Sequence, residues 1–79
     1  MKLPRNLYGR DLAHILCSRW SYTKINQVGS HIILQTGTPQ HHRISIPDHK
    51  PLRIGTLNAI LREVATVKGV SREDILAAQ

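Results

Sequence analysis

The sequence predicts an α+β fold: a three-stranded antiparallel sheet with helices on one of its faces. Apolar residues recur three and four positions apart in two segments, 9–19 and about 55–68, which is the spacing of amphipathic helices. Between them, residues 22–46 contain three short strand-like runs divided by turns with Gly or Pro. Loops this short join neighbouring strands only in antiparallel order. The predicted order is therefore α-β-β-β-α.

The first helix is expected over residues 9–19. Leu12, Ile15 and Leu16 form its apolar face. Pro4 prevents a helix from running through the preceding segment, 1–8. Asn6 is the candidate N-cap, one turn early, and Asp11 suits the positive end of the helix dipole.

The three strands are expected over residues 22–26, 31–36 and 42–46. Residues 27–30 (Gln-Val-Gly-Ser) form the first predicted turn, in which Gly29 is free to adopt a positive φ. Alternation in the second strand places Ile32 and Leu34 on one face and His31 on the other. If the apolar face meets the helices, His31 lies on the open face.

The second helix is expected to begin near Gly55–Thr56, and Gly69 either ends it or lies just beyond its end. Beyond it, Ser71 to Asp74 resembles a capping box, which predicts a short last helix over 72–78. The whole chain, 1–79, is expected to form one domain, because 79 residues support a single core. Without any Phe, that core must be built from Ile, Leu and Val, so any active site should be shallow.

The charge of the chain favours a polyanionic partner. The formal net charge is +6, with +7 in residues 1–62 and −1 in residues 63–79. A pI near 10.3 makes nucleic acid the first candidate. The chain has one cysteine, Cys17, and no apolar run suited to a signal peptide or a membrane span, so a reducing, cytoplasmic location is expected.

His31 is the candidate catalytic residue. A histidine on an open sheet face of a basic protein exchanges protons near neutral pH. Cleavage of RNA needs a base for the ribose 2′-OH and an acid for the leaving 5′-oxygen. The alternative from the residues alone is an ordinary exposed strand histidine.

Several cations are candidate phosphate contacts. Lys24 lies in the first strand, Arg43 in the third on the open face, and Lys50 in the loop that follows, near Arg53. Such contacts give affinity without sequence selectivity, and the alternative is a merely solvated face. No metal is expected, because the acids are few and the histidines at positions 14, 41, 42 and 49 lack ligand spacing. No cofactor motif is present.

Five short motifs occur in the order found in one known family. Gln27-Val28-Gly29-Ser30-His31 resembles the Gly-Ser-His motif of HicA toxins, also called the YcfA family. Ile46-Pro47-x-His49 resembles the family's strand end, and Leu52 to Arg62 its second-helix motif. Gly69 to Glu73 resembles the family's C-terminal motif. Leu3-Pro4, together with Gly9 to Leu12, resembles its N-terminal motif.

This resemblance implies a fold like that of double-stranded-RNA-binding domains and the role of toxin in a type II toxin–antitoxin system. HicA toxins are metal-independent endoribonucleases (mRNA interferases) that cut mRNA with one histidine and so arrest translation. That histidine corresponds to His31, and Lys24, Ser30, Arg43 and Lys50 become the expected RNA contacts. A HicB-type antitoxin is the implied protein partner, covering the active-site face.

The chain departs from the family pattern at two positions. Val28 replaces the basic residue that commonly precedes Gly-Ser-His, and Tyr8 replaces the serine that commonly caps the first helix. Neither change touches the expected chemistry. Two other functions are compatible with these residues. One is a non-catalytic module that recognises double-stranded RNA by its shape, and the other is a small protein whose positive charge serves only to bind an acidic partner.

Overall fold

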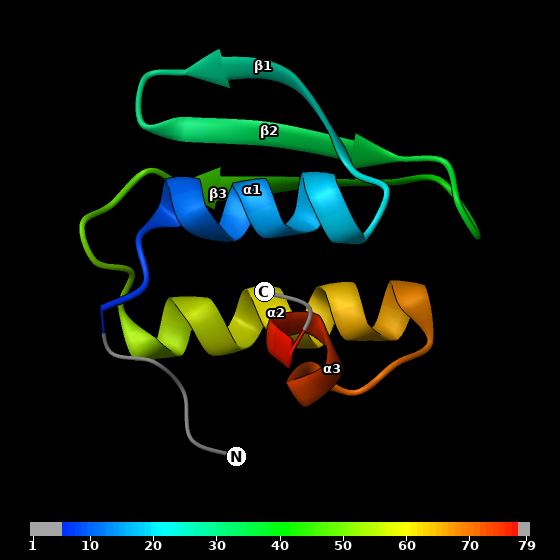
Figure 1. Cartoon of the computed structure of the whole chain (residues 1–79). Helices are drawn as coiled ribbons and strands as arrows, with labels where there is room; N and C mark the ends of the chain where they lie inside the picture. The colour runs from blue at the N-terminus through cyan, green and yellow to red at the C-terminus, as the bar shows by residue number, and fades with distance from the viewer. Residues whose placement is uncertain (1–5, 78–79) are drawn as a thin grey trace.

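The structure is a computed structural model that describes residues 6–77; Leu3 and Pro4 lie outside the described residues. The chain runs through α1 (Gly9–Arg19), β1 (Thr23–Val28), β2 (His31–Thr36), β3 (His42–Pro47), α2 (Ile54–Lys68) and α3 (Arg72–Ala77), as Figure 1 shows. The predicted order α-β-β-β-α, with a short helix added after it, is confirmed.

The sheet has the order β1-β2-β3, and both neighbouring pairs are antiparallel. The prediction for the first hairpin was wrong in its bounds: β1 starts at Thr23 and continues to Val28, and only Gly29 and Ser30 form the turn. Gly29 has a φ of 59°, so this one residue reverses the chain and the strand need not end at Asn26.

One β-bulge interrupts the pairing of β1 with β2, between Lys24 and Asn26. The bulge inserts Ile25 without a partner and so breaks the simple alternation of β1. All six residues of β1 are exposed, and Val28 keeps 60% of its surface. This strand therefore contributes little to the core and forms a free edge of the sheet.

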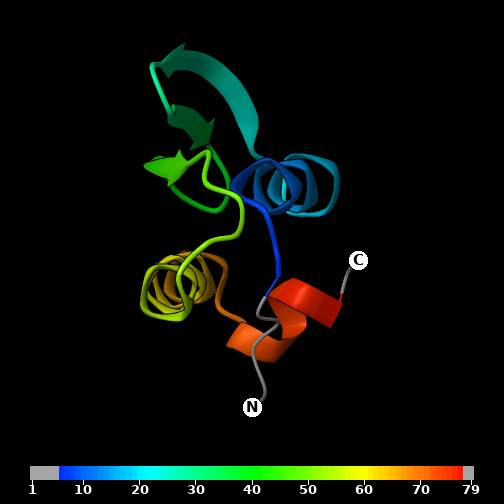
Figure 2. The same ribbon diagram turned by 90° about the vertical axis from the view of Figure 1, so that its left-hand side faces the viewer.

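Both long helices lie on the same side of the sheet (Figure 2). They bury their apolar faces against Ile32 and Leu34 of β2 and Ile44 and Ile46 of β3. The other core residues come from α1, α2 and α3, with Tyr22 and Leu52 from the connecting segments. The expected open face of the sheet is thereby confirmed.

The start of α1 is held by tertiary contacts rather than by a capping side chain. Tyr8 is the N-cap, and no side chain makes a capping hydrogen bond there, so the expectation for Asn6 was wrong. Instead, the Gly9 N–H donates to the His49 carbonyl at 3.0 Å. This bond satisfies one of the N–H groups that a helix start leaves unpaired, and it ties α1 to the loop after β3.

The ends of α2 and α3 follow the expected chemistry. Gly69 caps α2 in the left-handed conformation with a φ of 69°. In the predicted capping box, the Asp74 N–H donates to Ser71 Oγ and the Ser71 N–H donates to Asp74 Oδ2, both at 3.1 Å. Trp20 Nε1 donates to the Ile75 carbonyl at 3.2 Å and fixes α3 against the end of α1. Among residues 6–77, no helix has the length and apolar character needed to cross a membrane.

Candidate functional site

His31 lies at the first position of β2, where its side chain is exposed on the open face. Its register partners are Val28 on β1 and Pro47 on β3. The next residue, Ile32, is buried under the sheet, so the alternation of β2 determines which way His31 points. The exposure of the imidazole makes it accessible to a macromolecular substrate.

The imidazole is oriented by a serine on the neighbouring strand. His31 Nδ1 lies 3.4 Å from Ser45 Oγ, and both side chains belong to the open face. A serine hydroxyl either donates or accepts, so this contact is compatible with both neutral tautomers. It engages Nδ1 rather than Nε2.

The backbone around His31 is fixed by bonds between distant segments. The Asp48 N–H donates to the Ser30 carbonyl at 2.6 Å, which joins the β1–β2 turn to the loop after β3. The start of α1 joins the same loop through the Gly9–His49 bond. His31 therefore stands at a corner where three segments meet, and the bonds between these segments restrict the movement of its backbone.

Arg43 lies on the open face as predicted, but not beside His31. It pairs in register with Gln35 and donates to Gln35 Oε1 from Nη2 at 3.0 Å and from Nε at 3.3 Å. Gln35 is four residues beyond His31 on β2, about 13 Å along the strand at roughly 3.3 Å per residue. Arg43 and His31 thus lie at different places along the open face.

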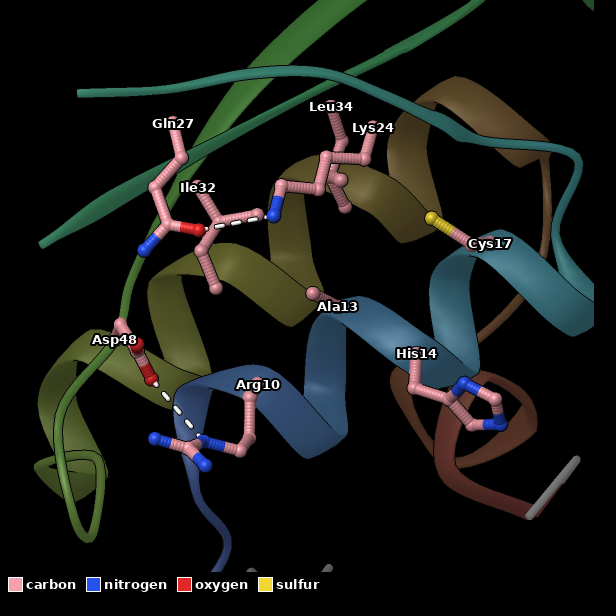
Figure 3. Close-up of a pocket in the computed structure, with 9 residues that line it drawn as sticks. All are labelled: Arg10, Ala13, His14, Cys17, Lys24, Gln27, Ile32, Leu34 and Asp48. Atoms are coloured by element: carbon pink, nitrogen blue, oxygen red, sulfur yellow. Dashed lines mark hydrogen bonds and ion pairs between the residues drawn. The ribbon is translucent and has the colours of Figure 1, made fainter.

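Lys24 lies on the opposite face of the sheet from His31. Its register partner is Leu34, which faces the helices, and its Nζ donates to Gln27 Oε1 at 2.9 Å. Figure 3 shows Lys24 directed toward α1. Sequence reasoning assigned Lys24 and Arg43 to one set of phosphate contacts, whereas the structure places them on two faces.

The other two predicted contacts lie on segments that meet at the His31 corner. Ser30 is exposed in the turn directly before His31, and Lys50 is exposed in the loop that follows β3. The same loop carries Asp48, whose Oδ1 lies 3.5 Å from Arg10 Nε. This pair is an ion contact without hydrogen-bond geometry, because Asp48 Oδ1 is buried and accepts no hydrogen bond from the described residues.

His42 is engaged in a polar cluster on the helix side. Its Nδ1 lies 2.9 Å from the Tyr22 hydroxyl and its Nε2 lies 3.7 Å from Glu63 Oε2. Burial, followed by the Glu63 carboxylate, raises the pKa of Tyr22 to about 12. Lys68 lies over the Tyr22 ring, 4.9 Å from its centre, and burial lowers the pKa of its ammonium. Sequence reasoning missed this cluster, although strand alternation puts His42 on the side of Ile44.

No group of three or more His, Cys, Asp or Glu side chains within residues 6–77 is arranged to hold a metal ion. Cys17 is partly buried beside β1, and burial raises the pKa of its thiol.

A comparison with protein families supplies the identity of the chain. The family model described as "HicA toxin of bacterial toxin-antitoxin" matches residues 9–65, which is most of the chain and includes the whole sheet. Searches of curated proteins and of solved structures gave no match. The matched segment contains His31, Ser45 and the corner that holds them. The chain belongs to the HicA toxin family of bacterial toxin–antitoxin systems.

Proposed function

We propose that this toxin acts as an endoribonuclease that cleaves mRNA with His31 as its catalytic side chain, and so arrests translation. Membership of the HicA family supports the toxin role. One observation carries the catalytic proposal: His31 is an exposed histidine at a pinned corner of the open face, and it contributes nothing to the core.

The chemistry requires proton transfer and charge stabilisation. A base removes the proton from a ribose 2′-OH, the oxygen attacks the adjacent phosphorus, and the leaving 5′-oxygen takes a proton. Because the nucleophile belongs to the substrate itself, a metal ion is not required to generate it. His31 Nε2 transfers one of these protons.

Ser45 supports either role of His31. When His31 is doubly protonated, Nδ1–H donates to Ser45 Oγ and Nε2–H acts as the acid. When Nδ1 carries the proton and donates to Ser45, Nε2 is free to act as the base. Ser45 is therefore a positioning residue that accommodates both states of the imidazole.

Ser30 and three cations hold the RNA chain. Ser30 and Lys50 lie on the segments that meet at the corner, Arg43 lies farther along the open face, and Lys24 lies behind the edge strand. Cationic contacts of this kind add affinity without sequence selectivity and stabilise negative charge that develops on the phosphate. We propose that a HicB-type antitoxin neutralises the toxin in the cytoplasm by covering the His31 face.

The experiment is RNA cleavage by the purified toxin, free of antitoxin, in the presence of EDTA. His31→Ala is compared with His41→Ala, which removes an exposed histidine from the loop before β3. Cleavage by the native protein and by His41→Ala, but not by His31→Ala, is the expected result. Equal cleavage by all three proteins refutes the assignment of His31.

The α-β-β-β-α order also suits a module that binds double-stranded RNA without cutting it. The same experiment separates the two functions. If the native protein and His31→Ala both leave the RNA intact yet bind it equally, the chain is a binding module and the catalytic proposal fails.

A further inference from the structure

A pocket of about 390 Å³ lies between α1 and the edge strand β1, on the side of the sheet away from His31. Figure 3 shows the side chains that line it. Its floor is apolar and comprises Ala13, Ile32 and Leu34, whereas its rim carries the basic side chains of Arg10, His14 and Lys24. The proposed cleavage chemistry does not use this pocket.

Two of the basic side chains are held in place by neighbours that also line the pocket. Lys24 Nζ donates to Gln27 Oε1 at 2.9 Å, and Arg10 Nε lies 3.5 Å from Asp48 Oδ1. Each cation keeps further N–H groups, because an ammonium has three and a guanidinium has five. Lys24 and Arg10 are thus positioned at the rim before an anion binds, and the Asp48 carboxylate beside Arg10 is the one acidic group among the described residues that line the pocket.

The pocket and the His31 side chain lie on opposite faces of the sheet, at the same corner. Ile32 on the pocket floor directly follows His31, and Asp48 on the rim is bonded through its N–H to the Ser30 carbonyl. The exposed turn Gly29–Ser30 joins β1, which borders the pocket, to β2, which begins with His31. A single strand of RNA that crosses this turn meets His31 on one side and the pocket on the other.

We propose that this pocket binds one nucleotide of the single-stranded RNA substrate, next to the part of the chain that is cut. The base rests on Ala13 and Ile32, and a phosphate contacts Lys24 and Arg10. Bases taken out of a stack are commonly held between apolar side chains, and the volume is within the range of small-ligand sites. This inference rests on the proposed function only in taking RNA as the substrate.

A nucleotide matches the pocket better than an acidic side chain of a protein partner does. A carboxylate needs the basic rim alone and leaves the apolar floor uncovered. A nucleotide combines a flat apolar base with an anionic phosphate, and so uses both the floor and the rim.

The test is an NMR titration of the ¹⁵N-labelled full chain with each of the four nucleoside 5′-monophosphates. We expect saturable shifts of the Cys17, Lys24 and Gln27 amides with at least one nucleotide. Ala13→Leu fills the floor, and Lys24→Gln removes a cation from an exposed strand position without altering the core. Each variant should weaken binding at least tenfold, whereas Arg62→Gln, which removes an exposed cation from α2 outside the pocket, should leave it unchanged.

The outcomes separate this inference from the proposed function. Cleavage that depends on His31, without nucleotide shifts at the pocket, overturns the pocket and leaves the catalytic proposal standing. Shifts at the pocket in a protein that cuts no RNA support the pocket and overturn the catalytic proposal. If Ala13→Leu and Lys24→Gln weaken antitoxin binding but not nucleotide binding, the pocket is a protein-binding site and the inference is wrong.

Discussion

Gly9 lies so close to Pro47 that a β-carbon on Gly9 would stand 2.8 Å from the Pro47 carbonyl carbon and would overlap its oxygen. Pro47 is the register partner of His31, so this contact joins the start of α1 to the corner of the candidate site. The close approach also permits the hydrogen bond from the Gly9 N–H to the His49 carbonyl. A side chain at position 9 would force these segments apart.

Gly9→Ala should therefore lower the free energy of unfolding by about 1–3 kcal/mol, the usual cost of forcing extra atoms into a packed site. Urea denaturation measures it. Gly55→Ala is the matched control, because a β-carbon at Gly55, within α2, meets no atom within 4 Å. The control should be neutral or stabilising by up to about 1 kcal/mol. Equal stability of the two variants would contradict the close contact.

Ser45→Ala should slow RNA cleavage about threefold to tenfold, since a neutral hydrogen bond is worth about 0.5–1.5 kcal/mol. The loss should appear in the cleavage rate, and the pH profile of cleavage should shift, because Nδ1 of His31 loses its partner. Ser45→Thr keeps the hydroxyl and should restore most of the activity. A Ser45→Ala protein with the native rate and pH profile would show that Ser45 does not position His31.

Arg43→Gln should weaken RNA binding and reduce the slope of log affinity against log salt by roughly one, the value for one lost phosphate contact. Binding is measured in the His31→Ala background, so that the RNA stays intact during the titration. Arg62→Gln removes a charge of the same kind from α2, away from the open face, and should change the slope less. If both substitutions reduce the affinity and the salt slope equally, Arg43 contributes to RNA binding only through the net charge of the protein.

Tyr22 should ionise at unusually high pH. In Tyr8→Phe, Tyr22 is the only tyrosine, and its phenolate absorbance should rise with a midpoint near its pKa of about 12. The unfolded protein in urea should titrate near the ordinary tyrosine pKa of 10.0. Glu63→Gln should lower the folded midpoint, because the Glu63 carboxylate contributes to the shift. A folded midpoint near 10 would contradict the burial of the hydroxyl.

The same shift predicts how stability changes with pH. The folded state binds the Tyr22 proton more tightly than the unfolded state, so this contribution is fully present below pH 10 and is lost as pH rises toward about 12. Tyr8→Phe should therefore lose more stability over this range than Tyr8→Phe/Tyr22→Phe. In both proteins the contribution of Lys68 to stability increases as pH rises, because its pKa is lowered in the folded state.

Local patterns in the sequence predicted most of the elements correctly. The apolar spacing of Leu12, Ile15 and Leu16 gave α1, and Gly69 marked the end of α2. The alternation of β2 placed His31 opposite Ile32. These features depend on residues within a few positions of one another, so backbone geometry alone translates them into structure. The role of His31 came from the family resemblance, because an exposed strand histidine alone does not indicate catalysis.

Only the tertiary structure decided which predicted contacts share a face. The β-bulge at Ile25 shifts the alternation of side chains along β1. Lys24 therefore pairs with Leu34 and lies on the helix side of the sheet. The start of α1 is held by the His49 carbonyl rather than by Asn6, and Tyr22, His42 and Glu63 meet from three separate segments. The sequence by itself determined where the elements lie and which way His31 points, because those are local properties. The pinned corner and the pocket between α1 and β1 depend on close contacts between segments distant along the chain, which local periodicity does not encode.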